Sequence, residues 1–256
     1  MKKDSIGVLF LLIAIGWVSC MGESEEKTNY QRYGVAALQP APALYTTDGE
    51  MEHIITSSAM DTLADLKDGD CFLLQFRANL FNYAEGEAVD ADIHSIEPIA
   101  AWTLEGTEAQ LPDTTFVNVA EDTALIRTVQ FFSPAIAKSQ LIRNRLFLQL
   151  TLNDRRETQQ ENYIFQYNPA VVAEQNGRRI YDLYLRAERR EANDSLIGKW
   201  IQTEALVLDQ LIREAGEAEK QIGNDSLHIR LNYPTGFSLD STLVRWASAN
   251  VYSIVL

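Results

Sequence analysis

The chain has 256 residues, a net charge of −14 at neutral pH and only two cysteines, Cys20 and Cys71. So acidic a chain repels the phosphates of nucleic acids and anionic lipid head groups, which excludes both as expected partners. Its length allows one large or two small β domains.

The first 19 residues have the features of a secretory signal peptide. Lys2 and Lys3 precede an almost wholly apolar run over residues 6–18, which is shorter than the roughly 20 residues that a membrane-spanning helix needs. The run ends in Ser19-Cys20, which is similar to a bacterial lipobox and implies cleavage before Cys20 and lipidation of its thiol. We expect the chain to be held to the membrane by lipid at Cys20. The alternatives are an ordinary signal peptide or a single membrane anchor.

Residues 20–31 are the expected tether. They contain Glu23, Glu25 and Glu26 and show no apolar period, which predicts flexible chain. The acidic residues are similar to the sorting signal that follows the lipidated cysteine in surface lipoproteins of Bacteroidota. We therefore expect a lipid-anchored protein of the cell outer membrane, periplasmic or surface-exposed. Cys71 is then the one thiol left, so no intramolecular disulfide can form, and we expect it to be a small buried hydrophobe.

Short alternating runs separated by turn residues follow, and they predict strands. In a first domain over residues 32–108 the expected strands are 33–39, 43–47, 51–57, 71–80 and 89–104. Asp48-Gly49 predicts a hairpin turn, and Pro98 marks an edge or a break in a long or bent strand. The polar stretch 105–114 is the expected domain boundary.

Longer runs predict a second β domain over residues 109–256. The expected strands are 116–119, 124–132, 145–152, 163–167, 179–191, 227–233 and 242–255, with 145–152 and 163–167 as the two arms of one hairpin. Residues 199–207 fit a strand or a helix. Apolar spacing over residues 209–222 predicts a helix capped by Asp209 and ended by Gly223-Asn224. Regular alternation leaves one face of each sheet wet, which favours antiparallel sandwiches or barrels.

Three groups of residues carry a resemblance to a known family. Asp68-Gly69-Asp70 enters a strand with Phe72, Leu74 and Phe76, Asn162-Tyr163-Ile164 follows a leucine-rich strand, and Asp182-Leu183-Tyr184-Leu185-Arg186 precedes the turn Asn193-Asp194. Over residues 32–256 these patterns resemble the NigD-like lipoproteins of Bacteroidota. The resemblance implies a mainly β fold, with a small OB-like β-barrel followed by an antiparallel β-sandwich, to which the spacing adds one short helix. The family carries no established catalytic residues, and its members are associated with bacteriocin gene clusters.

One tripeptide pattern recurs: Asp, then Ser or Thr, then an apolar residue or Thr. It occurs six times after Cys20, where average composition gives about one. It is similar to the O-glycosylation motif of Bacteroidota, with the acceptors Thr62, Thr114, Thr123, Ser195, Ser226 and Ser241. The alternative is that these residues open turns.

Few residues have the pattern of a chemical site. Asp90, Asp92 and His94 alternate along one expected strand, as metal ligands can, but a metal site usually needs ligands from a second element. We expect no metal and no cofactor, and we place His53 and His228 on solvent faces. Neither a Gly-x-Ser-x-Gly elbow nor a phosphate-binding glycine-rich loop is present, so we expect no catalytic residues.

Two clusters have alternative interpretations. Tyr163, Phe165 and Tyr167 could stack on sugars or contact a partner, although a place in the core is favoured. The five arginines of the second domain could recognise an acidic partner, although Glu188 and Glu191 favour cross-strand pairing. These arginines are Arg178, Arg179, Arg186, Arg189 and Arg190.

The sequence therefore predicts a non-catalytic, lipid-anchored cell-envelope protein whose two-domain β scaffold binds a protein or glycan partner. The alternatives are a bacteriocin-associated immunity lipoprotein and a carbohydrate-active hydrolase. A hydrolase would need two carboxylates that converge in one cleft, one of them with a raised pKa.

Overall fold

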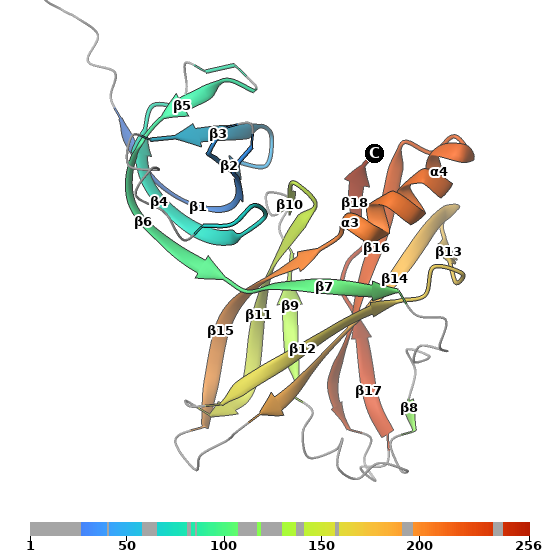
Figure 1. The fold of residues 1–256 in the computed structure, drawn as a ribbon. Helices are drawn as coiled ribbons and strands as arrows, with labels where there is room; N and C mark the ends of the chain where they lie inside the picture. The colour runs from blue at the N-terminus through green and yellow to red at the C-terminus, as the bar shows by residue number, and fades with distance from the viewer. Residues whose placement is uncertain are drawn as a thin grey trace, which may run out of the picture.

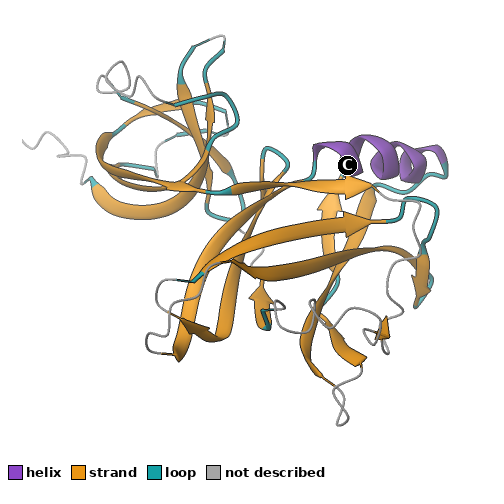
Figure 2. Ribbon diagram, turned by 60° about the horizontal axis from the view of Figure 1, so that its bottom comes forward, coloured by secondary structure: helices purple, strands orange, loops and turns teal. Residues whose placement is uncertain are grey.

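A computed structural model gives the fold of the chain. It describes residues 27–39, 41–57, 66–80, 83–84, 86–106, 117–118, 130–136, 141–156, 159–190, 197–237 and 243–256. The predicted signal peptide and the lipidation residue Cys20 lie outside these residues. The described chain contains a small curled sheet, a larger second sheet and one short helical segment (Figures 1 and 2), which confirms the predicted mainly β class. No helix in the described ranges is long and apolar enough to cross a membrane.

The first sheet curls into a small barrel. Its strands are β1 (Thr28–Ala37), β2 (Ala43–Thr47), β3 (Glu52–Thr56), β4 (Cys71–Ala78), β5 (Ala88–Asp90) and β6 (Asp92–Ile99), in the order β5-β3-β2-β1-β4-β6. Although β5 and β6 lie at opposite edges of this order, only Ala91 separates them, and its N–H donates to the Thr56 carbonyl at 2.9 Å. One bent segment thus joins both edges, as in an OB-type five-stranded Greek-key barrel.

The barrel core follows from the alternation in β4. Phe72, Leu74 and Phe76 are fully buried, because alternate side chains of a strand point to the same face. Gly34 of β1 lies against Phe72, and a Cβ atom there would be 2.4 Å from the ring atom Cε2. The predicted hairpin turn is also confirmed: β2 pairs with β3, and Gly49 has φ 98°, a conformation that glycine adopts without strain.

The second sheet contains the remaining strands. They are β7 (Ala101–Gly106), β8 (Val117–Asn118), β9 (Phe132–Ala135), β10 (Leu141–Ile142), β11 (Arg145–Arg156), β12 (Gln160–Tyr167), β13 (Ala173–Gln175), β14 (Arg178–Arg190), β15 (Ile197–Val207), β16 (Ser226–Phe237), β17 (Leu243–Ser248) and β18 (Tyr252–Val255). Their order is β10-β11-β15-β7-β12-β14-β16-β17-β8, with β9 beside β11, β13 beside β14 and β18 beside β16.

The pairing of these strands is more varied than the predicted antiparallel arrangement. β7 runs parallel to both β12 and β15, and β14 runs parallel to β16. The predicted hairpin of residues 145–152 with residues 163–167 is wrong, because β11 pairs with β15 and β12 pairs with β14. β7 links these two halves, and their inner faces share one hydrophobic core (Figure 1). The sequence left residues 199–207 open between strand and helix; they form β15.

The observed strands differ from two of the segment boundaries that the sequence predicts, namely the end of the tether and the boundary between the two domains. β1 begins at Thr28, so residues 28–31, which the sequence assigned to the tether, are strand. The chain passes from the first sheet to the second between Ile99 and Ala101, whereas the sequence placed the boundary between residues 108 and 109. The transition therefore falls within the expected long strand rather than in the polar stretch that follows it.

The predicted helix is present as one helical segment over Asp209–Gln221. It consists of α3 (Asp209–Leu211), the π-helical turn η3 (Ile212–Gly216) and α4 (Glu217–Gln221). Gly223, with φ 87°, follows its end as predicted. Asp209 is not the cap: Leu208 occupies that position, and Asp209 instead accepts a hydrogen bond from Arg145 Nη1 at 2.7 Å.

Packed side chains join the two sheets. The Tyr33 ring of the barrel stacks on Phe147 of β11 with centroids 5.0 Å apart, and the Arg143 guanidinium lies 4.1 Å from the centre of the Tyr45 ring. Cys71 is buried in the same cluster, as predicted. Burial raises the pKa of its thiol to about 11, so it is an inert core residue rather than a nucleophile.

Candidate functional site

The second sheet leaves a seam between two strand edges. Among the described strands, β9 pairs only with β11, and β18 pairs only with β16. β9 thus forms an edge of one half of the sheet. The edge of the other half is formed by β18 and by the end of β17 beyond its short pairing with β8. We call the space between β9 and residues 248–252 the seam pocket.

A β-bulge shapes one side of this pocket. Asn232 of β16 lies opposite Ser248, and Ile229 lies opposite Tyr252. Three residues, 249–251, therefore face two residues of β16, and the extra residue interrupts what would otherwise be one edge strand. The Ala249 N–H still donates to the Leu231 carbonyl at 2.8 Å. Bulges of this kind redirect side chains and are common beside functional sites.

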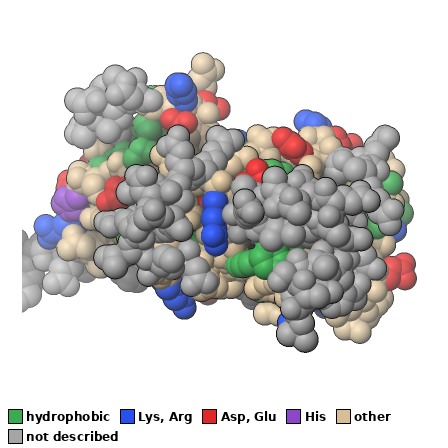
Figure 3. Space-filling view, turned by 90° about the horizontal axis from the view of Figure 1, so that it is seen from below, with side chains coloured by type: hydrophobic (Ala, Val, Ile, Leu, Met, Phe, Trp, Pro, Cys, Tyr) green, Lys and Arg blue, Asp and Glu red, His purple; other side chains and the backbone are tan. Residues whose placement is uncertain are grey.

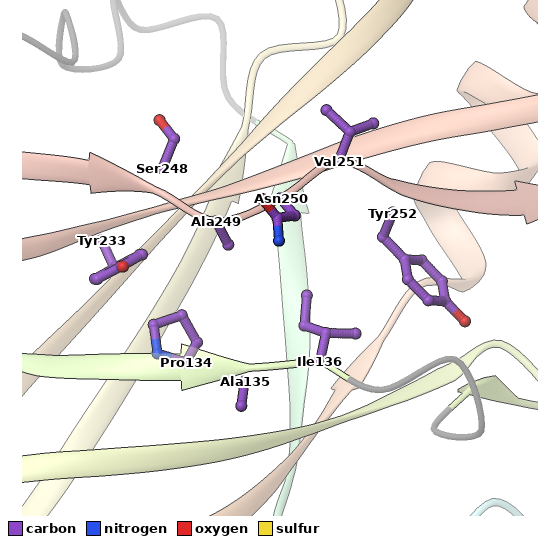
Figure 4. A pocket seen from close by; sticks show the side chains of 9 residues that line it. All are labelled: Pro134, Ala135, Ile136, Tyr233, Ser248, Ala249, Asn250, Val251 and Tyr252. Atoms are coloured by element: carbon purple, nitrogen blue, oxygen red, sulfur yellow. The ribbon is translucent and has the colours of Figure 1, made fainter.

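The seam pocket has a volume of about 450 Å³. Figure 4 shows that the side chains of Pro134 and Ile136 point from β9 towards residues 248–252 on the opposite side of the pocket, whereas Ala135 points away from them. The full lining is Pro134, Ala135, Ile136, Tyr233, Ser248, Ala249, Asn250, Val251 and Tyr252.

The chemistry of this lining is that of a binding site. Two tyrosine rings offer stacking surfaces, and Asn250 offers a hydrogen-bonding amide beside apolar side chains. The Ser248 hydroxyl donates to Asn232 Oδ1 at 2.6 Å. Burial raises the pKa of Tyr252, so its phenol is neutral at physiological pH. The described residues of the lining carry no carboxylate, imidazole, amine or thiol.

The sequence did not single out the residues of this pocket. Residues 242–255 have the pattern of one terminal strand, and nothing in that pattern marks the bulge that divides it. The bulge depends on the register of both segments against β16, which is a tertiary property.

The candidate metal ligands are not brought together as a site. Asp92 pairs with Lys27 Nζ at 3.1 Å, and His94 is exposed. Within the described ranges, no group of three or more acidic, histidine or cysteine side chains could hold a metal ion.

The expectation for His53 is wrong. This side chain is 5% exposed, not solvent-facing, and its Nε2 lies 2.9 Å from Asp48 Oδ2. Burial opposes ionisation of Asp48, but His53 and the N–H groups of Met51 and Glu50 outweigh it and hold the pKa of Asp48 below its usual value. His228 is half-buried, and its Nδ1 lies 2.8 Å from Ser253 Oγ.

The aromatic cluster is structural, and three of the five arginines form hydrogen bonds within the chain. Tyr163, Phe165 and Tyr167 are buried in the core of the second sheet, which confirms the favoured interpretation. Arg179 Nε donates to Glu219 Oε1 at 2.8 Å, and Arg189 Nε donates to Gln130 Oε1 at 3.0 Å. Arg179 and Arg189 therefore form hydrogen bonds with other residues of the same chain. Arg186 Nη2 likewise donates to Gln166 Oε1 at 3.3 Å.

One of the six candidate O-glycosylation residues is described. Ser226 begins β16, is half-buried, and donates from Oγ to Asp225 Oδ1 at 2.8 Å. The other five, Thr62, Thr114, Thr123, Ser195 and Ser241, lie outside the described residues, as does Cys20. Glycosylation at all six stays a prediction.

Comparison with known proteins finds similarity at the level of structure. No family model matches the chain, and no curated protein matches it significantly. An uncharacterised protein from Parabacteroides merdae is 18% identical over 88% of this chain and 98% of that chain, with a TM-score of 0.68. A candidate lipoprotein from Bacteroides fragilis is 11% identical over 89% of this chain and 98% of that chain, with a TM-score of 0.50.

A third solved structure bears the name of the family that the sequence resembles. It is a NigD-like immunity protein from Bacteroides caccae, 14% identical over 89% of this chain and 96% of that chain, with a TM-score of 0.44. The chain therefore shares its fold with the proteins from Parabacteroides merdae and Bacteroides fragilis.

Proposed function

We propose that this protein is a non-catalytic, lipid-anchored protein of the cell outer membrane that binds a protein or glycan partner at the seam pocket. The lining of that pocket carries the proposal. Its tyrosines and Asn250 can hold a ligand by stacking and hydrogen bonding. Among the described residues that line it, none carries a carboxylate, imidazole or amine that could act as a base or activate Ser248 as a nucleophile.

The anchor rests on the sequence. The basic start, the apolar run over residues 6–18 and Ser19-Cys20 together support lipidation at Cys20. Two or more acyl chains would hold the chain stably at the membrane, with the β scaffold beyond it. A bacteriocin as the bound partner would make the protein an immunity lipoprotein; an envelope glycan would make it a surface receptor.

The pocket is tested by substituting one of its exposed residues. Asn250→Ala removes an amide from the bulge, and we expect it to weaken partner binding by about fivefold, because one hydrogen bond contributes about 1 kcal/mol. Purified envelope glycans and bacteriocins are screened for binding to immobilised full-length protein. Asn29→Ala, the same change at an exposed position of β1, is the control and leaves binding unchanged. Equal weakening by both variants, or turnover of a bound glycan, would contradict the proposal.

The anchor is tested by metabolic labelling with an alkyne-tagged fatty acid. Wild-type protein should carry the label, and Cys20→Ser should lose it and leave the membrane fraction. Label that persists in Cys20→Ser would contradict the proposed anchor, because it would show that the lipid is attached to a residue other than Cys20.

A further inference from the structure

The helical segment, the β10–β11 turn and the end of β18 enclose a second cavity, which we call the helix pocket. These three elements lie together at the upper end of the second sheet in Figure 1. The helix pocket has a volume of about 460 Å³, which is within the range of small-molecule binding sites.

One wall of the helix pocket is apolar. It combines Leu141 of β10, Ile212 of the helix and the consecutive residues Ile254, Val255 and Leu256. Ile254 is buried, whereas Val255 is 85% exposed, more than any other large apolar side chain in the described part of the chain. Because covering exposed apolar surface is favourable, this wall can bind the apolar part of a ligand.

Three cationic side chains share the same pocket. They are Arg143 of the turn and Arg213 and Lys220 of the helix. Glu217 is the acidic side chain of the described lining, and the lining stays net positive even when the main-chain carboxylate of Leu256 is counted. On the face seen from below, by contrast, the described Lys and Arg side chains are scattered singly (Figure 3).

This local excess of positive charge stands against a net charge of −14 for the whole chain. Salt screens charges that lie more than about 8 Å apart at physiological ionic strength. The charges of the lining therefore decide which ligand the pocket attracts, and they favour an anion.

The cations of the pocket have few partners within the chain. Arg213 Nη2 lies 3.9 Å from Glu214 Oε1, and both side chains are exposed. The Arg143 guanidinium packs over the Tyr45 ring. Among the described residues, none forms an ion pair with Arg143 or Lys220. Their charges are thus available to a ligand.

Two irregular backbone segments border the pocket. Arg143 and Asn144 have φ angles of 45° and 61°, a region that asparagine tolerates better than arginine does. The helix is π-helical over Ile212–Gly216, and such turns are rare but frequent at functional sites. A Cβ atom on Gly216 would lie 2.8 Å from Leu256 Cδ2, so glycine lets the end of β18 pack closely on this turn.

We propose that the helix pocket binds an anionic amphiphile, a fatty acid of medium chain length. Its carboxylate accepts charge-assisted hydrogen bonds from Arg143, Arg213 and Lys220. Its alkyl chain packs on the apolar wall, and each methylene removed from water adds to the affinity. The helix pocket shares no residue with the seam pocket, so either proposal can fail without the other.

The test is a calorimetric titration of the full-length protein in detergent with sodium octanoate, from which the heat of the same titration into detergent alone is subtracted. Octylammonium chloride keeps the chain and reverses the charge, whereas sodium acetate keeps the charge and removes most of the chain. We expect saturable binding of octanoate and at least about tenfold weaker binding of both comparison compounds.

A pair of matched variants tests the place of binding. Lys220→Gln should weaken octanoate binding by about tenfold, because it removes one charged donor from the pocket. Lys199→Gln is the control, since Lys199 is exposed on β15 outside the pocket and its loss changes the net charge equally. This variant should bind octanoate as the wild type does.

Three results would overturn the proposal. The first is the absence of saturable heat with octanoate at up to about 10 mM, roughly ten times a Kd of 1 mM. The second is equal affinity for octanoate and either comparison compound, which would mean that the chain or the charge alone drives binding. The third is equal weakening by Lys220→Gln and Lys199→Gln.

Discussion

The barrel and the second sheet are both built from strands with alternating apolar and polar residues, but they differ in which polar residues they bury. In the barrel, the segment β5–β6 joins the two edges, and the buried polar residues Thr46 and His53 both lie on the β2–β3 hairpin. The second sheet keeps unpaired edges at β9 and β18 and buries two acids, Glu204 and Glu219. Open edges and buried charge both reduce stability or invite association. Both sheets have edge strands, since β5 and β6 of the barrel also pair on one side only, so among the described residues it is the buried acids that distinguish the second region.

The largest effect should come from breaking the barrel core. Phe72→Ala removes a fully buried ring from the centre of the first sheet and should lower the free energy of unfolding by about 3–5 kcal/mol. Denaturant unfolding followed by circular dichroism measures this loss. Met51→Ala, at a residue 36% exposed on the hairpin, should change it by less than about 0.5 kcal/mol. Similar values for both variants would show that the barrel core is not packed as described.

The next effect concerns Glu219, an acid that the fold stabilises in its charged form. It accepts hydrogen bonds from Arg179, from Tyr181 Oη at 2.7 Å and from Asn224 Nδ2 at 2.5 Å. Burial alone would raise its pKa, but Arg179 and the other donors outweigh burial and lower it. Glu219→Gln should therefore cost about 2 kcal/mol at pH 7.

The same lowered pKa fixes the pH dependence of this contribution. A depressed pKa means that the stability from Glu219 is present above the unfolded value of about 4.3 and is lost as the pH falls through the folded value. The loss of unfolding free energy in Glu219→Gln should become smaller as the pH falls below about 4. A cost that is equal at pH 7 and pH 3 would argue against a charged Glu219.

Glu204 should behave in the opposite way, with a smaller effect. Its raised pKa means that folding favours the protonated form, so the charged form lowers stability as the pH rises above about 4.3. Glu204→Gln, which keeps the shape without the charge, should raise stability at pH 7 by on the order of 1 kcal/mol. Unfolding at pH 7 and at pH 4.5 measures the difference. A clear loss of stability at pH 7 would mean that Glu204 has a cationic partner after all.

Local sequence patterns predicted the elements of this fold well, because they depend on neighbours in the chain. Asp48-Gly49 specifies its hairpin through the φ that glycine permits. The spacing of Leu211, Ile212 and Ala215 indicates a helix whichever surface it packs on. β4 was evident from Phe72, Leu74 and Phe76, since period-two alternation is the direct signature of a half-buried strand.

What the sequence could not give is which strand pairs with which. The patterns of β11 and β12 fit a hairpin, but β11 pairs with β15 and β12 pairs with β14. The bulge between β17 and β18 exists only as a mismatch of register with β16, so the seam pocket was missed. Glu204 was missed for the same reason: only its place opposite Leu148 shows that it points inward.

Hydrogen–deuterium exchange of backbone amides tests most directly the contrast between the doubly paired strands of the barrel and the edge strands of the second sheet. The N–H groups of β1 and β4, strands that are paired on both sides, should exchange slowest. Those of β9 and β18 should exchange at least roughly tenfold faster, because edge strands open locally more easily. Exchange in β9 and β18 that is as slow as in β1 and β4 would contradict the account, since it would mean that the seam is closed.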